Sequence, residues 1–310
     1  MHTAFISHPD CLLHDMGPHH PESPARLTAI EDALAASGLM DKLERHAAPL
    51  ATREQLKRVH TPDYIASLDA SSSRALSAGL AYLDPDTAMN QHSLKAAYRA
   101  AGAVILATDL VMGKKADNAF CSVRPPGHHA ERDRAMGFCL FNNIAAGVAH
   151  AMDAHALERV AVVDFDVHHG NGTEDIFRDD PRVMMVSIFQ HPFYPYGGVT
   201  GRSERMVNIP LAAGSGGEIF RRAVSEFWLP SLERFKPQML FISAGFDAHT
   251  DDDLASLNLV ENDYAWVTER IKEVAGIHAA NRIVSSLEGG YALPALGRSV
   301  AAHLRVLSDS

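Results

Sequence analysis

Ionisable side chains cluster at the end of one apolar segment. Val160-Ala-Val-Val leads directly into Asp164, Asp166 and His168, with glycines close behind. The continuous apolar run predicts a buried strand of a parallel sheet. Because side chains alternate across a strand, the two acids and the histidine are expected on one face. Buried ionisable groups are costly without a partner. A bound metal ion is therefore favoured over a strand end that simply meets solvent.

Polar, glycine-containing segments also follow three other predicted strands, at 118–123, 239–244 and 282–287. Strands that alternate with helical segments are typical of a parallel sheet covered on both faces. In open sheets of this kind, ligands bind outside the carboxyl ends of the strands. The side chains expected to meet at that edge are His128, His129, Asp166, His168, Asp247 and Tyr291.

Asp166, His168 and Asp247 are the candidate ligands of a catalytic metal. A catalytic zinc typically has three protein ligands and one open position. Two carboxylates and one imidazole form a harder set than the usual histidine-rich zinc site, so Fe²⁺, Co²⁺ and Mn²⁺ are also compatible. Asp164 is expected to orient a catalytic histidine, to bind a second, monovalent cation, or to do both.

Two adjacent histidines and one tyrosine complete the candidate chemistry. A Pro-Pro-Gly segment interrupts the chain before His128 and His129, so both rings can turn toward the same site. A histidine with a pKa near neutral suits general base catalysis. Tyr291 follows two glycines, and its phenol is expected to donate a hydrogen bond to a developing oxyanion.

In order and spacing, these motifs resemble those of the histone deacetylase family. The resemblance spans nearly the whole chain. It implies the arginase–deacetylase fold, a three-layer α/β domain with an eight-stranded parallel sheet, and residues 1–310 are predicted to form that one domain. The matching segments are His20-Pro-Glu-Ser-Pro-Ala-Arg26, Arg124-Pro-Pro-Gly-His128-His129-Ala, Gly137-Phe-Cys, Asp164-Phe-Asp166-Val-His168-His-Gly-Asn171-Gly-Thr, Ser-Ala-Gly-Phe-Asp247-Ala and Glu288-Gly-Gly-Tyr291.

The resemblance implies a catalytic role for several positions. His129 would act as the general base and acid, and Tyr291 would polarise the amide carbonyl. His128 would be paired electrostatically with Asp164. The implied zinc ligands are Asp166, His168 and Asp247.

The resemblance also implies three supporting sites. A narrow channel for an acyl-lysine side chain would be lined by Gly137, Phe138, Tyr194, Leu254 and Gly290. A structural potassium ion would be held by Asp164, Asp166, His168, Ser187 and Ile188. Arg26 would match the arginine of the inner path for acetate release.

Two positions place the chain within the family. Asn171 stands where class I members have an aspartate, as in class II enzymes and the bacterial amidohydrolases similar to them. Leu254 stands where polyamine-specific members carry a glutamate. An apolar residue there favours acyl-lysine substrates, although the acidic neighbours at 251–253 weaken this inference.

Alternative functions follow from the same residues. The nearest is hydrolysis of acetylpolyamines or other small amides. A ureohydrolase would share the fold but needs acids for a second metal, and these are not visible after Asp166 and Asp247. A module that binds acylated ligands without turnover is disfavoured because every proposed catalytic position holds a competent residue.

Composition limits the partners and the compartment. The net charge of −10 argues against nucleic acid and against an anionic membrane surface. The odd number of cysteines, at positions 11, 121 and 139, and the lack of a signal-peptide pattern predict a cytoplasmic location.

Loops such as 14–24 are candidates for contacts in a homo-oligomer. The serines at 71–73 are predicted to form a local loop.

Asn171→Asp tests the interpretation of the amide behind the catalytic histidine. A carboxylate stabilises an imidazolium ion more than a neutral amide does. The acidic limb of the pH–rate profile should therefore move to higher pH. An unchanged acidic limb, measured as kcat/KM against pH, would count against contact between Asn171 and the base.

Overall fold

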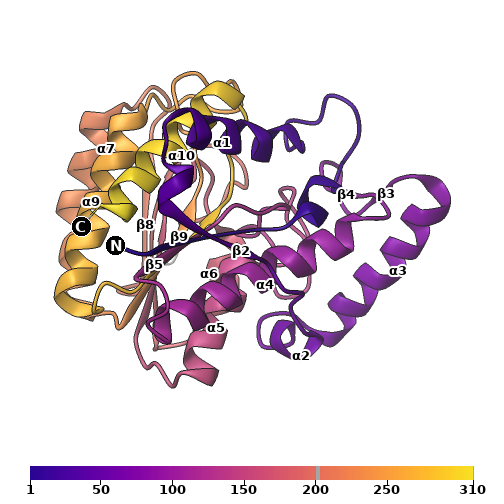
Figure 1. The fold of residues 1–310 in the computed structure, drawn as a ribbon, viewed down its shortest axis with the longest axis horizontal. Helices are drawn as coiled ribbons and strands as arrows, with labels where there is room; N and C mark the ends of the chain where they lie inside the picture. The colour runs from indigo at the N-terminus through magenta and orange to yellow at the C-terminus, as the bar shows by residue number, and fades with distance from the viewer. Residues whose placement is uncertain (200–202, 310) are drawn as a thin grey trace.

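The computed structural model describes residues 1–199 and 203–309, and its centre is an eight-stranded sheet (Figure 1). All neighbouring strands of this sheet are parallel, in the order β2-β1-β5-β10-β9-β6-β7-β8. The strands are β1 Thr3–Ser7, β2 Leu43–Ala47, β5 Asn118–Cys121, β6 Val160–Asp164, β7 Val183–Gln190, β8 Met206–Leu211, β9 Met239–Ala244 and β10 Ile283–Leu287. A separate antiparallel pair consists of β3 Ala81–Tyr82 and β4 Ala88–Met89. The predicted eight-stranded parallel sheet is confirmed.

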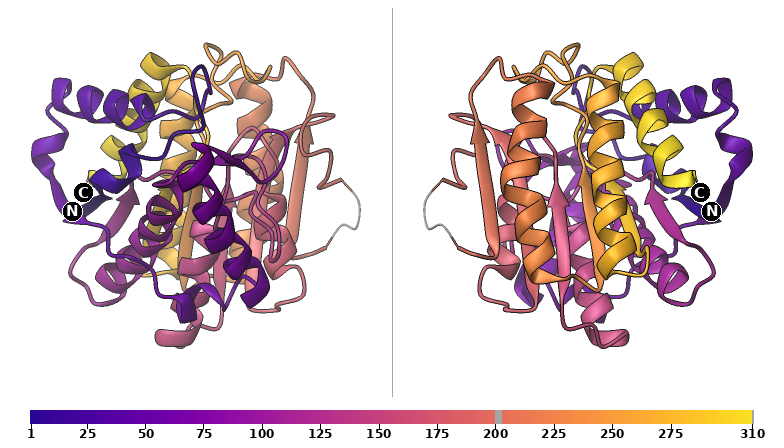
Figure 2. Two further views of the ribbon diagram at one scale, coloured as in Figure 1. Left: turned by 90° about the vertical axis from the view of Figure 1, so that its right-hand side faces the viewer. Right: turned by 90° about the vertical axis from the view of Figure 1, so that its left-hand side faces the viewer.

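Helices cover both faces of the sheet (Figure 2). One face carries α1 Ala25–Ala36, α7 Gly217–Ala223, α8 Leu229–Phe235, α9 Glu261–His278 and α10 Leu293–Ser308. The other carries α4 Ser93–Met112, α5 Asn143–Ala154 and α6 Asn171–Phe177, with α2 Arg53–Leu56 and α3 Pro62–Ala78 outside them. Two short 3₁₀ helices, η1 Pro9–Leu12 and η2 Met40–Lys42, and the π-helical turn η3 Val224–Trp228 complete the elements. This layering buries the central strands on both sides.

Local sequence signals explain where the helices next to the site begin. The Asn142 side chain accepts a hydrogen bond from the backbone N–H of Ala145 at 3.0 Å and so caps α5. Thr61 caps α3 in the same way, with proline at the first helical position. Asn142 also donates to the carbonyl of Ala130, which ties the start of α5 to the histidine-containing loop.

The predicted loop at Ser71–Ser73 was wrong, because these serines lie inside α3. The Ser71 hydroxyl donates to the carbonyl of Ser67 at 2.9 Å, and the Ser73 hydroxyl donates to Asp69 at 3.1 Å. Serine side chains that bond backward in this manner are compatible with a helix interior. The edge strands β2 and β8 were not predicted. β2 is mostly polar and only Leu43 in it is buried, and β8 contains a proline at position 210, so both lack the usual strand signal.

The strand order brings the chemistry-bearing segments together. β5, β10, β9 and β6 are consecutive neighbours in the sheet, and all four run in one direction. The segments that follow them therefore meet at one edge, although the first and the last of them lie more than 160 positions apart in the chain. No helix in the described residues is both long and apolar enough to cross a bilayer.

Candidate active site

Two successive turns, each closed by an aspartate side chain, follow the end of β6. The Asp164 carboxylate accepts a hydrogen bond from the backbone N–H of Asp166 at 3.1 Å. The Asp166 carboxylate does the same for the N–H of His168 at 2.9 Å. Aspartate side chains that bond two residues ahead replace strand pairing with a turn. The regular strand thus ends at Asp164, whereas the prediction that the acids share one face assumed a strand reaching to His168. The two carboxylates nevertheless converge on one site.

Asp166, His168 and Asp247 form a compact group suited to a metal ion. The Nδ1 atom of His168 lies 3.0 Å from Oδ1 of Asp166 and 3.2 Å from Oδ2 of Asp247. The other oxygen of Asp247 accepts from the N–H of Val167 at 3.0 Å. Oδ2 of Asp247 is buried and receives no hydrogen bond from the described part of the chain. A buried carboxylate oxygen without a donor fits a site that holds a cation.

Asp109, His150 and His155 form a second group of ligand-type side chains, on the outer side of α4 and α5. Nε2 of His150 and Nε2 of His155 each lie 2.8 Å from Oδ1 of Asp109. Nη1 of Arg58 lies 3.3 Å from Nδ1 of His150. Because the guanidinium is positively charged, it disfavours a metal ion at this group. The group at the end of the sheet is therefore the candidate metal centre.

The two adjacent histidines lie together but have different partners. Their ring centroids are 4.0 Å apart. Nδ1 of His128 lies 3.0 Å from Oδ2 of Asp164, and Nδ1 of His129 lies 2.7 Å from Oδ1 of Asn171. Both turn toward one site, as the interruption by Pro-Pro-Gly predicted. Asp164 thus contacts His128, and the orienting role expected for it stays a prediction.

The environments of these histidines separate their pKa values. Burial opposes the charged form of His128, but Asp166 and Asp164 outweigh it and raise the pKa of His128 to about 10. Burial and the neighbouring His128 and His168 lower the pKa of His129 well below its usual value. At neutral pH, these shifts favour an imidazolium ion at His128 and a neutral ring at His129.

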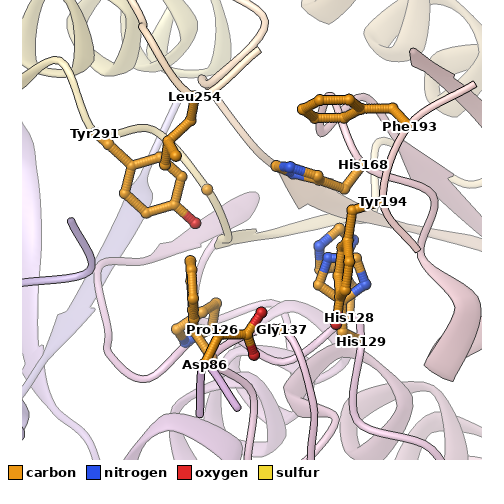
Figure 3. A pocket seen from close by; sticks show the side chains of 12 residues that line it. Asp86, Pro126, His128, His129, Gly137, His168, Phe193, Tyr194, Leu254 and Tyr291 are labelled. Atoms are coloured by element: carbon orange, nitrogen blue, oxygen red, sulfur yellow. The ribbon is translucent and has the colours of Figure 1, made fainter. Parts of the chain in front are cut away.

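A cavity of about 220 Å³ opens onto these groups. Figure 3 shows His168, His128 and His129 on one side, with Tyr291 opposite and its hydroxyl directed into the cavity. Burial raises the pKa of the Tyr291 phenol well above 10, so the hydroxyl stays protonated and can donate a hydrogen bond. The arrangement places a neutral imidazole and a protonated phenol on opposite sides of one space.

The predicted channel residues mostly line this cavity. Gly137, Phe138, Tyr194 and Leu254 do so, whereas Gly290 does not and its neighbour Gly289 takes that place. Gly290 instead turns its carbonyl toward Nε of Arg26 at 2.6 Å. The lining residues that sequence reasoning missed are Asp86, Pro126 and Phe193. The ring of Phe193 stacks on His168 with a centroid distance of 5.4 Å.

Two buried side chains from distant segments hold the Tyr291 loop. Arg26 donates to the carbonyls of Gly290 and Glu288, and its guanidinium lies 4.9 Å from the centre of the Tyr291 ring. Oδ2 of Asp252 accepts from the N–H of Tyr291 at 2.6 Å, while Oδ1 accepts from the N–H of Leu254 at 3.1 Å. Sequence reasoning missed Asp252 because it is one of three consecutive acids. Its burial distinguishes it from exposed Asp251 and Asp253.

Glu288 was also missed, although it ends a predicted strand. Its carboxylate accepts from the N–H groups of Gly127 and His128, at 2.7 and 3.1 Å. Burial raises the pKa of Glu288 to about 7. These contacts fix the loop that carries both histidines against the end of β10.

Two of the residues expected around potassium, Ser187 and Ile188, lie on β7, next to the strand that ends in Asp164. Ser187 pairs in register with Asp164 across β6 and β7. The Ser187 hydroxyl is buried and has no hydrogen-bond partner in the described residues, and Ile188 is buried beside it. Asp164 and Ser187 are thus adjacent at the end of the sheet.

Comparison with known proteins identifies the family. The sequence model of the histone deacetylase domain matches residues 20–307. The chain is 38% identical to a histone deacetylase-like amidohydrolase of Pseudomonas aeruginosa, over 93% of this chain and 81% of that protein. It is 37% identical to a probable deacetylase of Archaeoglobus fulgidus, with coverages of 94% and 82%. The chain belongs to the histone deacetylase family.

A solved structure of the histone deacetylase family confirms the fold. The crystal structure of the HDA15 HD domain superposes with a TM-score of 0.91 at 33% identity, covering 99% of this chain and 89% of that one. The arginase–deacetylase fold predicted from the sequence is thus confirmed. Membership in the family identifies the chain as a hydrolase.

Gly289→Ala should weaken metal binding without unfolding the protein. A Cβ atom at this position would lie 1.9 Å from Oδ2 of Asp247 and 2.7 Å from Oδ2 of Asp166. Displaced ligands or their supports typically cost about 10–100-fold in metal affinity. Metal content after dialysis against a weak chelator measures the loss. In the control Gly216→Ala, the nearest atom is 3.4 Å away, and metal content should not change.

Asp252→Asn should loosen the Tyr291 loop, because an amide can accept hydrogen bonds on one side only. We expect kcat to fall about 10–100-fold, the range typical for residues that orient catalytic groups. Exposed Asp253 provides the matched control, Asp253→Asn. Equal activity of the two variants would show that the Asp252 contacts do not position Tyr291.

Proposed function

We propose that the chain is a zinc-dependent deacylase that hydrolyses the amide of acetyl-lysine-type substrates, in proteins, peptides or small molecules. One observation carries the proposal. A narrow cavity reaches a group of two carboxylates and one imidazole, with a neutral histidine on one side and a protonated tyrosine on the other. Amide hydrolysis needs a base and an oxyanion donor at such positions.

Asp166, His168 and Asp247 would hold the metal, which we propose to be Zn²⁺, with Fe²⁺ or Co²⁺ as alternatives. When bound there, the metal would polarise the substrate carbonyl and lower the pKa of water. The buried Oδ2 atom of Asp247, which receives no hydrogen bond from the described residues, supports this assignment. A structural K⁺ is proposed near Asp164 and Ser187, where the buried hydroxyl lacks a partner in the described residues.

The side chains of the protein supply the proton transfers. His129 would accept a proton from water at Nε2, since its Nδ1 faces the Asn171 oxygen. It would then return that proton to the leaving amine. Tyr291 would donate to the oxygen that becomes negative during attack. His128 would remain charged beside Asp164 and stabilise negative charge nearby.

The cavity walls favour an acyl-lysine side chain. Phe138, Phe193 and Leu254 provide apolar contacts for its methylene groups. Asp86 also lines the cavity, which makes an acetylpolyamine or another small cationic amide the second candidate substrate. Burial and the neighbouring Asp84 raise the pKa of Asp86 to about 6, which reduces its negative charge in slightly acidic solution. At neutral pH the carboxyl is still largely ionised, so this residue keeps the second candidate open.

A substrate panel tests the proposed function. The protein loaded with one defined metal is assayed on acetyl-lysine peptides, longer acyl-lysines, acetylpolyamines and guanidino compounds. The highest kcat/KM is expected for acyl-lysine substrates. Higher kcat/KM on acetylpolyamines would select the second candidate. Release of urea from guanidino compounds, with two catalytic metals per chain, would refute deacylation.

Tyr291→Phe tests the proposed donor. Loss of one oxyanion donor typically costs on the order of 10²–10³ in kcat. The variant should therefore be severely impaired on the preferred substrate while its metal content and Tm stay close to wild type. Wild-type-like turnover would remove Tyr291 from the mechanism.

A further inference from the structure

The Asn171 side chain bridges His129 and a carboxylate that does not reach the cavity. Its oxygen lies 2.7 Å from Nδ1 of His129, and its nitrogen donates to Oε1 of Glu131 at 2.7 Å. We propose that Glu131 is a positioning residue, which sets the tautomer of His129 by orienting the Asn171 amide. The catalytic part of this inference rests on the role proposed above for His129.

The orientation of the amide decides which nitrogen of His129 can act as a base. An amide oxygen only accepts hydrogen bonds, and an amide nitrogen only donates them. With the Asn171 oxygen facing Nδ1, the ring proton must lie on Nδ1, and the lone pair of Nε2 stays free. A flipped amide would present its N–H to Nδ1, move the ring proton to Nε2 and block proton acceptance there.

Glu131 is the strongest of the groups that fix this orientation. The Asn171 nitrogen also lies 3.2 Å from the sulfur of Met136 and 3.5 Å from the carbonyl of His129. Both are weaker acceptors than a carboxylate at 2.7 Å, since charge-assisted hydrogen bonds are about twice as strong as neutral ones. Removal of the Glu131 carboxylate should therefore weaken the preference for this amide orientation. A hydrogen-bond donor at position 131 should reverse the orientation.

The surrounding contacts hold Glu131 in place. Its second oxygen accepts from Nη2 of Arg134 at 2.8 Å. Its backbone carbonyl lies 2.9 Å from Nδ1 of buried His60, and its N–H donates to the Arg134 carbonyl at 2.9 Å. The backbone on both sides of the side chain is thus fixed. Oε1 remains directed at Asn171, on the side away from the cavity.

Three variants distinguish the effect of the amide orientation from the effects of side-chain size and charge at position 131. Glu131→Gln keeps an acceptor oxygen and should retain kcat within about threefold. Glu131→Lys offers only donors, so kcat should fall at least about 10-fold with KM nearly unchanged, as for other residues that orient a catalytic group. Asp133→Lys makes the same charge change at an exposed position two residues away and should behave like wild type.

A second substitution tests the tautomer directly. In the double variant Glu131→Lys/Asn171→Asp, the new carboxylate accepts from both the introduced ammonium and Nδ1–H of His129. It should recover most of the kcat lost in Glu131→Lys. A merely structural defect at position 131 would not be repaired by a change at 171, so a double variant no better than Glu131→Lys would overturn the proposal.

Nitrogen NMR provides a readout independent of activity. In protein labelled with ¹⁵N-histidine, the His129 signals are assigned by their loss in His129→Gln. Wild type and Glu131→Gln should show the Nδ1–H form, and Glu131→Lys the Nε2–H form. An unchanged Nδ1–H pattern in Glu131→Lys would overturn the inference. If His129→Gln keeps wild-type turnover, the proposed base is refuted, while the NMR pattern still decides whether Glu131 sets the tautomer.

Discussion

The burial of three carboxylates at the carboxyl end of one parallel sheet is the constraint on which the site depends. Asp164, Asp166 and Asp247 are all buried, and isolated buried charges are unfavourable. Each gives one oxygen to a backbone N–H two residues ahead or on the neighbouring loop. Of the remaining oxygens, Oδ2 of Asp164 faces His128, Oδ2 of Asp166 accepts from the N–H of Gly289, and Oδ2 of Asp247 receives no hydrogen bond from the described residues. The backbone therefore fixes each carboxylate before any metal or substrate is present.

The Tyr291 loop is held by segments that are remote in sequence. Arg26 comes from α1, and Asp252 comes from the loop after β9, yet both bond to the backbone within two residues of the tyrosine. Two glycines give this loop little stiffness of its own, so its position must come from outside contacts. The same carboxylate of Asp252 bonds to Leu254. The Tyr291 backbone and one wall of the cavity are thus linked through one buried side chain.

Contiguous motifs made much of this site predictable from sequence. The segment from Val160 to Asn171 contains a buried strand, its turn-forming acids and a histidine in one run, and the fold follows from the alternation of such strands with helices. Residues that act through a contact distant in sequence left no such signal. Asp252 resembles its exposed neighbours, and Glu131 resembles any acid in a polar loop. Gly290 was assigned to the channel because adjacent glycines cannot be told apart without knowing which carbonyl meets Arg26.

The two adjacent histidines show how different partners produce different proton states. The carboxylates of Asp166 and Asp164 outweigh the cost of burial and raise the pKa of His128 to about 10. His129 faces a neutral amide instead, and burial together with the neighbouring His128 and His168 lowers its pKa well below its usual value. Sites that separate the pKa values of neighbouring groups can assign one to charge stabilisation and the other to proton transfer. Two charged histidines with centroids 4.0 Å apart would repel each other. Burial and the neighbouring cationic rings thus keep His129 neutral, while the carboxylates around His128 keep that ring charged.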